Sequence, residues 1–134
     1  MILQLNTDGL RNSRAEIIQF LQDHSIKIAA IQETKLQPSS APIDFPNYKL
    51  IRRDRPAANG GGGLAFLVHH SISYVEEEVD HLCDHHLEVQ SITATINQTE
   101  LQLFNIYLPP ASSCPGYSFS SDTLDSLLNC SDGD

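Results

Sequence analysis

Two short apolar segments on either side of one helical pattern open the chain, and this order restricts the fold more than any other feature. Residues 2–6 alternate apolar and polar side chains as a strand does, and Asp8 and Gly9 supply a turn after them. The apolar run at 28–31 predicts a second, buried strand. Strands joined through a crossover helix are parallel neighbours. The opening therefore predicts a β-α-β unit and an α/β fold.

The helix between these strands has a start signal of its own. Ser13 with Glu16 three residues later forms a capping box, which predicts a helix that begins there. Apolar positions then give the helix a buried face until about His24: Ile17, Ile18, Phe20 and Leu21.

Beyond residue 36 the sequence predicts mainly strands. Three prolines between 36 and 47 indicate an ordered loop. Strands are expected at 48–51, 63–68, 72–79, 87–96 and 101–108, with a hairpin turn at 97–100 joining the last two. A short amphipathic helix capped by Ser121 is expected near the C-terminus. The 134 residues, 40% of them hydrophobic, suit a single domain.

Composition narrows the class of protein. No segment approaches the roughly 18 consecutive apolar residues of a membrane span. The short apolar start lacks the basic segment of a signal peptide, and three cysteines without a Cys-x-x-Cys pair argue against a disulfide framework. We therefore expect an intracellular protein with reduced thiols.

Charge is distributed unevenly along the chain. All eight cations lie at or before Arg55 together with six acids, so this part carries +2 and the remainder carries −11 of the net −9. A polyanion such as DNA can be bound only by the part up to Arg55, because the acidic remainder repels phosphates. The alternative interpretation is that the acidic part is simply a solvated surface.

Asp8 and Glu33 follow the ends of the two strands of the β-α-β unit. Parallel neighbours bring their carboxyl ends together, where α/β sheets place their ligands. The two carboxylates then offer hard oxygen ligands to one Mg²⁺. The alternative is that each is a turn former or a helix cap.

Tyr107 and Lys35 are further candidates. Tyr107 ends a predicted strand, where its phenol can orient a phosphate or a nucleophilic water, or can pack at the sheet end with a solvated hydroxyl. Lys35 follows Glu33 by two residues and can balance the charge of a phosphate, or is an ordinary surface lysine.

Two other clusters are weaker candidates for a site. The glycines at 60–63 are not followed by Gly-Lys-Ser/Thr and precede a strand, which indicates a flexible loop and not a phosphate-binding one. Histidines and a cysteine between 69 and 86 are metal-ligand types, but their spacing matches no closed zinc module, and the three glutamates at 76–78 beside them indicate an exposed loop.

Three segments occur in one order along the chain. They are Leu-Asn-Thr-Asp-Gly-Leu at 5–10, Ile-Gln-Glu-Thr-Lys at 31–35, and Asn-Ile-Tyr-Leu-Pro-Pro at 105–110. Together they resemble the endonuclease/exonuclease/phosphatase superfamily, in particular the apurinic-type endonuclease domain of non-LTR (LINE-like, jockey-type) retrotransposon proteins. The segments at 60–67 and 87–89 are also similar to that group. The resemblance runs over essentially the whole chain.

The resemblance implies roles for four residues. Asn6 would belong to the polar network of the active site, Asp8 and Glu33 would lie at or near a divalent metal, Mg²⁺ or alternatively Mn²⁺, and Tyr107 would contact the scissile phosphate. The implied reaction is metal-assisted hydrolysis of a DNA phosphodiester by water. It leaves a 3′-hydroxyl for a reverse transcriptase of the same polyprotein to extend, which implies a nuclear location.

The chain also departs from the family. Leu5 stands where many relatives carry Trp, and the later Gly-Asp-Phe-Asn and Ser-Asp-His motifs, the second of which supplies the general-base pair, have no counterpart. Residues 1–134 therefore resemble the N-terminal portion of one domain. The implied fold is the first half of a four-layer α/β sandwich, here one mixed sheet with flanking helices and an uncovered apolar face.

We thus expect an endonuclease fragment that is inactive alone and is completed by a downstream half-domain. Two alternatives stay open. One is a non-catalytic remnant that binds metal or protein, and the other is a phosphoesterase of the same fold that acts on a phosphorylated small molecule or lipid.

Overall fold

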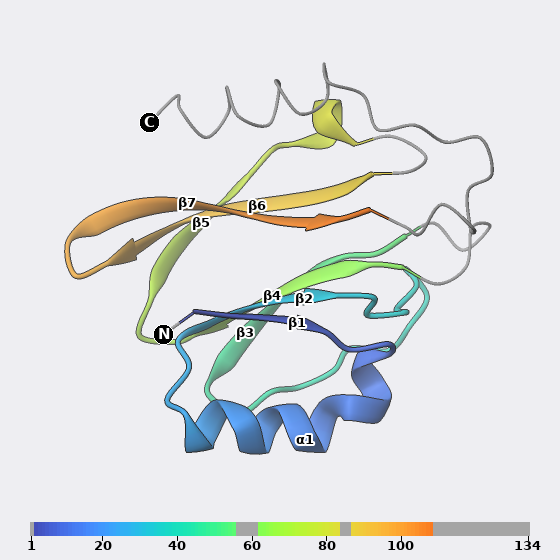
Figure 1. Ribbon diagram of the computed structural model, residues 1–134, viewed down its shortest axis with the longest axis horizontal. Helices are drawn as coiled ribbons and strands as arrows, with labels where there is room; N and C mark the ends of the chain where they lie inside the picture. The colour runs from blue at the N-terminus through green and yellow to red at the C-terminus, as the bar shows by residue number, and fades with distance from the viewer. Residues whose placement is uncertain (1, 56–61, 84–86, 109–134) are drawn as a thin grey trace.

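Two stacked sheets with one helix beneath them form the part of the chain that the computed structural model describes, residues 2–55, 62–83 and 87–108 (Figure 1). The first sheet has the order β1-β2-β4-β3 and the second has the order β5-β6-β7. The elements are β1 (Ile2–Asn6), α1 (Leu10–Asp23), β2 (Ile28–Gln32), β3 (Tyr48–Arg53), β4 (Leu64–His69), β5 (Ser73–Glu77), a 3-10 turn (Asp80–Leu82), β6 (Glu88–Ile96) and β7 (Thr99–Tyr107).

The predicted β-α-β unit is confirmed. Strands β1 and β2 pair in parallel, from Ile2 opposite Ile28 to Asn6 opposite Gln32. The other pairings in the first sheet are antiparallel, so that sheet is mixed, as expected. The carboxyl ends of β1, β2 and β7 lie at the same end of the molecule, on the right in Figure 1.

Helix α1 begins at Leu10, earlier than the capping box predicts, and that prediction is wrong. The N–H groups of Gly9 and Leu10 donate to the carbonyl oxygens of Glu33 and Thr34, each at 2.8 Å. The hydroxyl of Ser13 donates instead to the carbonyl of Thr7, at 3.3 Å. The loop after β2 thus satisfies the first N–H groups of the helix. This long-range partner leaves no local sequence signal.

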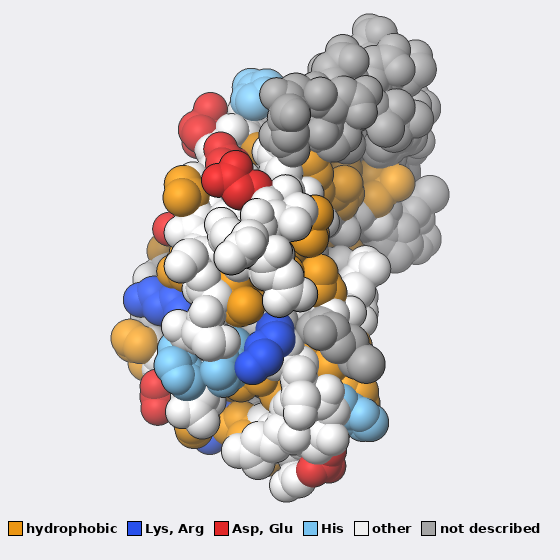
Figure 2. Space-filling view, turned by 90° about the vertical axis from the view of Figure 1, so that its left-hand side faces the viewer, with side chains coloured by type: hydrophobic (Ala, Val, Ile, Leu, Met, Phe, Trp, Pro, Cys, Tyr) orange, Lys and Arg blue, Asp and Glu red, His pale blue; other side chains and the backbone are white. Residues whose placement is uncertain are grey.

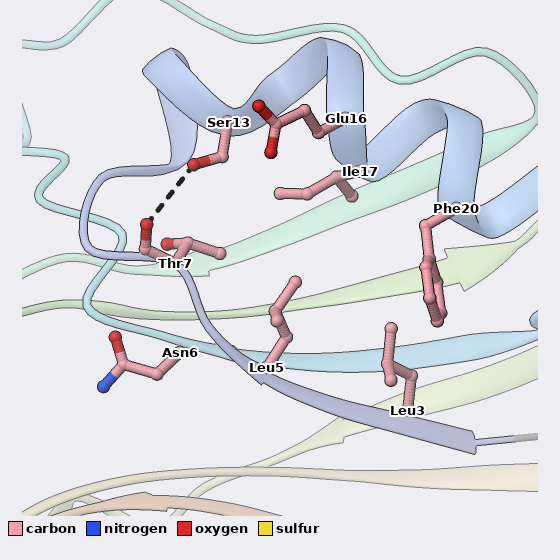
Figure 3. Close-up of a pocket in the computed structure, with 8 residues that line it drawn as sticks. All are labelled: Leu3, Leu5, Asn6, Thr7, Ser13, Glu16, Ile17 and Phe20. Atoms are coloured by element: carbon pink, nitrogen blue, oxygen red, sulfur yellow. Dashed lines mark hydrogen bonds between the residues drawn. The ribbon is translucent and has the colours of Figure 1, made fainter.

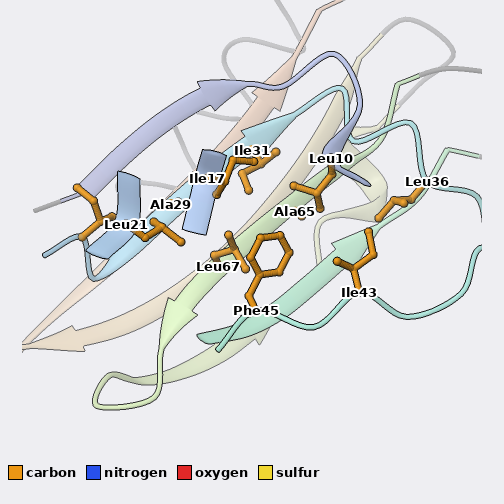
Figure 4. Packing of buried hydrophobic residues seen from close by; sticks show 11 residues of the cluster. Leu10, Ile17, Leu21, Ala29, Ile31, Leu36, Ile43, Phe45, Ala65 and Leu67 are labelled. Atoms are coloured by element: carbon orange, nitrogen blue, oxygen red, sulfur yellow. The ribbon is translucent and has the colours of Figure 1, made fainter. Parts of the chain in front are cut away.

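Apolar side chains cover both faces of the first sheet. One core lies between α1 and the sheet (Figure 4); its members include Leu10, Ile17, Leu21, Ala29, Ile31, Ala65 and Leu67. A second core lies between the two sheets and includes Ile28, Ala30, Phe66, Val68, Ile92 and Ala94. Central strands buried on both faces carry continuous apolar runs, which explains the sequence of β2 and β4. Phe20, expected on the buried helix face, is 42% exposed.

The expectation that the chain supplies one sheet is wrong, because β5, β6 and β7 form a second sheet stacked on the first. Residues Gln90, Ile92 and Ala94 of β6 are buried, as a strand that packs against another sheet requires. Alternation in β6 and β7 predicts that one face is covered but does not identify what covers it. The described residues therefore build three layers: a helix, a mixed sheet and an antiparallel sheet.

The predicted hairpin between β6 and β7 is confirmed as a two-residue turn. Asn97 and Gln98 have φ values of 51° and 68°, which a type I′ turn requires. Strand β5 is shorter than the predicted 72–79. The expected helix near Ser121 lies outside the described residues, as do Cys114 and Cys130. No helix in the described part of the chain is long and apolar enough to cross a membrane.

Candidate active site

Asp8 and Glu33 lie in the turns that follow β1 and β2, at one end of the first sheet. The turns are in direct contact, because Thr7 N–H donates to the Gln32 carbonyl at 3.0 Å and Gly9 N–H to the Glu33 carbonyl at 2.8 Å. Asp8 and Glu33 both have left-handed backbones, with φ of 48° and 55°. Such conformations are uncommon for residues other than glycine and cluster at functional sites. The fold thus fixes the two predicted metal ligands beside each other.

Tyr107 reaches this edge from the second sheet. Its hydroxyl donates a hydrogen bond to Oε1 of Glu33. Burial of the phenol, and then the bond to Glu33 and its negative charge, raise the pKa of Tyr107 to about 12. The phenol is therefore protonated at neutral pH and acts as a hydrogen-bond donor. This contact brings together residues 74 positions apart and joins the two sheets at the site.

The metal-free chain is expected to show this contact in a tyrosine titration. Because the neutral phenol is favoured, Tyr107 adds stability that is complete below pH 10 and is lost as the pH rises toward 12. With ¹³Cζ-labelled tyrosine, NMR should give a Tyr107 midpoint near 12 in the wild type. Glu33→Gln should lower that midpoint, because it removes the negative charge. A wild-type midpoint near 10, the ordinary tyrosine value, would show that the contact is not made.

Lys35 forms an ion pair with Asp8. The hydrogen bond and charge of Asp8 raise the pKa of Lys35, and Glu33 adds a smaller effect of the same sign. The Lys35 and Asp8 side chains are 48% and 76% exposed, so water screens the pair and it contributes little to stability. Its importance is local: a cation lies beside both carboxylates.

Asn6 is exposed at the end of β1. Its Oδ1 accepts the backbone N–H of Asp8 at 3.2 Å. An asparagine that bonds two residues onward stabilises a tight turn. Asn6 is thus placed at the same edge as the other candidates and shapes the backbone that carries Asp8.

A buried amide network lies directly beneath these residues. Asn105 Nδ2 donates to the carbonyls of Ile31 and Ala65 at 2.9 and 3.0 Å, and Asn105 Oδ1 accepts from Gln32 Nε2 at 3.0 Å. Gln90 joins the network, with its Oε1 3.4 Å from Asn105 Nδ2. Buried polar groups that are all bonded make a rigid unit. The network therefore locks the two sheets together just below the candidate site.

Sequence reasoning assigned no site role to Glu88 or Arg55, which lie beside Tyr107. Glu88 stands opposite Tyr107 in the β6–β7 register, and its Oε2 accepts a bond from Arg55 at 2.6 Å. Strand alternation offers the missed signal. Glu88 and Gln90 occupy the same face as the apolar residues Ile92 and Ala94, so the polar end of an otherwise buried face marks the site.

Asp8 and Glu33 are the residues that fit a divalent metal. Among residues 2–55, 62–83 and 87–108 no group of three or more His, Cys, Asp or Glu side chains is arranged to hold an ion. Mg²⁺ commonly binds proteins through one or two carboxylates and keeps several waters. Asp8 and Glu33 carry carboxylates on two turns whose backbones are in direct contact, and Asp8 is largely solvent-exposed, so the pair suits this mode of binding.

The histidine-rich stretch lies elsewhere. His69 and His70, 4.3 Å apart between ring centres, lie beside Lys27 and Asn47 at the opposite end of the first sheet. Figure 2 views this end and shows histidine and basic side chains side by side. Ser71 N–H donates to Nδ1 of His69 at 3.2 Å, so that lone pair is engaged. His81 contacts Glu78, and residues 84–86 lie outside the described chain.

No protein-family model and no curated protein sequence matches the chain. Solved structures do. The endonuclease domain of TRAS1, a telomere-specific non-LTR retrotransposon, aligns with a TM-score of 0.62 and 14% identity over 94% of this chain and 52% of that one. Humanized D. rerio TDP2 aligns with a TM-score of 0.64 and 14% identity over 96% and 57%. A protein of the endonuclease/exonuclease/phosphatase family from Leptotrichia buccalis aligns with a TM-score of 0.62 and 11% identity over 96% and 62%.

The chain has the endonuclease/exonuclease/phosphatase fold. At 11–14% identity these similarities establish the fold alone. The chain spans between about half and three-fifths of the length of these structures. The resemblance that the sequence motifs carry is thus confirmed at the level of the α/β fold, and the chemistry has to be argued from the site.

Proposed function

We propose that the chain is the N-terminal part of a divalent-metal-dependent DNA endonuclease that hydrolyses phosphodiesters. One observation carries the proposal: the Tyr107 hydroxyl, from the second sheet, is bonded to Glu33 in the turn that packs against Asp8. Lys35 pairs with Asp8 and is also affected by the charge of Glu33, so these two turns gather two carboxylates, a phenol donor and an ammonium group. That combination suits a phosphate diester, whose charge increases as water attacks.

Each residue has a definite task in this proposal. Asp8 and Glu33 would hold Mg²⁺, or alternatively Mn²⁺, which when bound offsets negative charge on the phosphoryl and leaving-group oxygens. Tyr107, protonated at neutral pH, would turn its single O–H from Glu33 to a phosphoryl oxygen when the substrate binds. Lys35 would add positive charge at the same place, and Asn6 would hold the Asp8 turn in shape.

DNA is the proposed substrate because of the kind of protein that shares the fold. The similar structures include the TRAS1 endonuclease domain, an AP endonuclease from Leishmania major, and D. rerio TDP2 in complex with a single-stranded DNA product. All eight Lys and Arg residues of the chain belong to the stretch that carries Asp8, Glu33 and Lys35. By the resemblance to retrotransposon domains, the reaction would be target-site nicking in the nucleus.

We also propose that a further half-domain completes the site and the four-layer sandwich. Strand β1 is at the edge of the described first sheet, and hollows flank it on both sides. One, of about 330 Å³, lies between β1 and α1; its apolar wall is Leu3, Leu5, Ile17 and Phe20, and polar side chains line the end nearer Asn6 (Figure 3). The other, of about 400 Å³, lies between the sheets at Ile2 and Ile106. Hollows with apolar walls at an open strand edge suit added strands.

Supercoiled plasmid is the substrate that tests the proposed activity. The reading frame extended beyond Asp134, through the half-domain and the reverse transcriptase proposed to follow it, should nick the plasmid with Mg²⁺ and leave 3′-hydroxyl ends. Removal of the metal with EDTA should reduce nicking to background, and Mn²⁺ should restore it. Residues 1–134 alone should be inactive.

Other outcomes would select the alternatives. Metal binding without cleavage of any phosphodiester would favour a non-catalytic remnant. Turnover of a phosphorylated small molecule or lipid without DNA cleavage would favour a phosphoesterase of the same fold.

A further inference from the structure

Gly62 and Gly63 connect the Glu33 turn to the rest of the molecule. The N–H groups of Thr34 and Lys35 donate to the carbonyl oxygens of Gly63 and Gly62, at 3.2 and 2.8 Å. The two described glycines of the predicted flexible run are thus hydrogen-bonded to the segment that carries the candidate site. Contacts that hold these glycines in place therefore also hold the turn that carries Glu33.

On their other side, the glycines contact the ion pair between Arg55 and Glu88. Glu88 Oε1 accepts the N–H of Gly63 at 2.9 Å, and its Oε2 accepts from Arg55 at 2.6 Å. The two side chains are only 19% and 16% exposed. Largely buried charges are costly to leave unpaired, so each partner holds the other in place.

The glycines leave no space between the ion pair and the Glu33 turn. A Cβ added to Gly62 would collide with the Arg55 guanidinium, and one added to Gly63 would collide with Oγ1 of Thr34. Their φ values of 64° and 94° also disfavour any side chain. Gly62 and Gly63 therefore form a thin spacer. A shift of the ion pair on one side of it displaces the Glu33 turn on the other.

We propose that Glu88, held by Arg55, is a positioning residue that sets the conformation of the 33–35 turn through Gly63. The proposal rests on the proposed function only for the consequence that this turn carries a metal-binding carboxylate. Glu88 acts here as a hydrogen-bond acceptor for a backbone N–H. Glu88 also stands opposite Tyr107 in the strand register, so it lies next to the residue whose hydroxyl is bonded to Glu33.

Glu88→Ala tests the proposal in the whole chain, with two companion variants. Glu88→Gln keeps an oxygen for the Gly63 N–H and removes the charge. Asp54→Ala is the matched control, because it breaks the neighbouring Arg52–Asp54 ion pair, which has the same 2.6 Å separation and similar exposure. Urea unfolding confirms that each variant is folded before it is compared.

Amide hydrogen exchange, measured by NMR, reports the protection of the 33–35 turn directly and needs no metal. In Glu88→Ala the N–H groups of Thr34 and Lys35 should exchange at least about tenfold faster, while the central amides of β2 stay protected. Glu88→Gln should recover part of the protection, and Asp54→Ala should leave it unchanged. If Glu88→Ala does not fold, the Glu88→Gln and Asp54→Ala comparison gives the same answer.

Mn²⁺ binding, monitored by electron paramagnetic resonance, is the second measurement. The dissociation constant should rise about 10- to 100-fold in Glu88→Ala, as for other groups that orient a metal ligand. Unchanged exchange at Thr34 and Lys35 would overturn the proposal, as would an equal loss of protection in Asp54→Ala. If the wild type binds no Mn²⁺, the metal site of the proposed function fails, and exchange alone still decides the role of Glu88.

Discussion

Glu33→Gln is expected to lower Mg²⁺-dependent nicking by the completed domain about 1000-fold, the equivalent of about 4 kcal/mol of transition-state stabilisation. Glutamine has the shape of glutamate and can still accept the hydrogen bond from Tyr107. It lacks the negative charge that strengthens the binding of a divalent cation. The change therefore separates the charge of residue 33 from its packing, and initial nicking rates on supercoiled plasmid measure it.

Glu100→Gln provides the control for this prediction. Glu100 is an exposed carboxylate at the start of β7, at the far end of the strand from Tyr107. Its replacement should leave the nicking rate within about twofold of the wild type, since exposed changes away from the site have small effects. Nicking by Glu33→Gln at the wild-type rate would remove Glu33 from the proposed site.

Asn105→Leu is expected to destabilise the chain by about 3 kcal/mol or more. Asn105 is 1% exposed, and its amide joins the carbonyls of Ile31 and Ala65 to the side chain of Gln32. Leucine has a similar volume but offers no donor or acceptor. Each buried polar group left without its partner costs about 1–3 kcal/mol. Urea unfolding, with an unchanged slope, measures the loss.

Gln102→Ala is the matched comparison for Asn105→Leu. Gln102 also carries an amide on β7, but it is less buried, and its hydrogen bond to the Ser91 hydroxyl is long, at 3.4 Å. The variant should lose less than about 1 kcal/mol. Equal effects of the two substitutions would contradict the account of Asn105 as the amide that locks the sheets together.

The sequence predicts the part of the fold that follows from local patterns and from the chirality of crossovers. The parallel pair β1 and β2 follows from two apolar runs with a helix between them, and the same rule places Asp8 and Glu33 at one edge. The start of α1 is not predictable in this way, because its first N–H groups bond to the turn after β2. The second sheet is missed for a similar reason: alternation shows that a face is buried but not what buries it.

The candidate site likewise contains residues that the sequence predicts and residues that it does not. Asp8, Glu33 and Tyr107 stand at strand ends in recognisable motifs, so their types and positions indicate chemistry before their contacts are known. Arg55 stands in no such motif, and the similarity at 87–89 assigns no role to Glu88; the β6–β7 register and the path of the glycines bring both residues to the site. Residues that act by holding others are found from contacts and not from spacing.

Paramagnetic broadening by Mn²⁺ is the decisive test of a metal site at Asp8 and Glu33, because it locates a bound divalent ion in the ¹⁵N-labelled chain without requiring catalysis. We expect that the amide signals of Asp8, Glu33 and Thr34 broaden first, that Mg²⁺ reverses the effect, and that Glu33→Gln weakens it. Broadening centred on His69 and His70 at the opposite end of the sheet, with the Asp8 and Glu33 signals unaffected, would contradict this expectation.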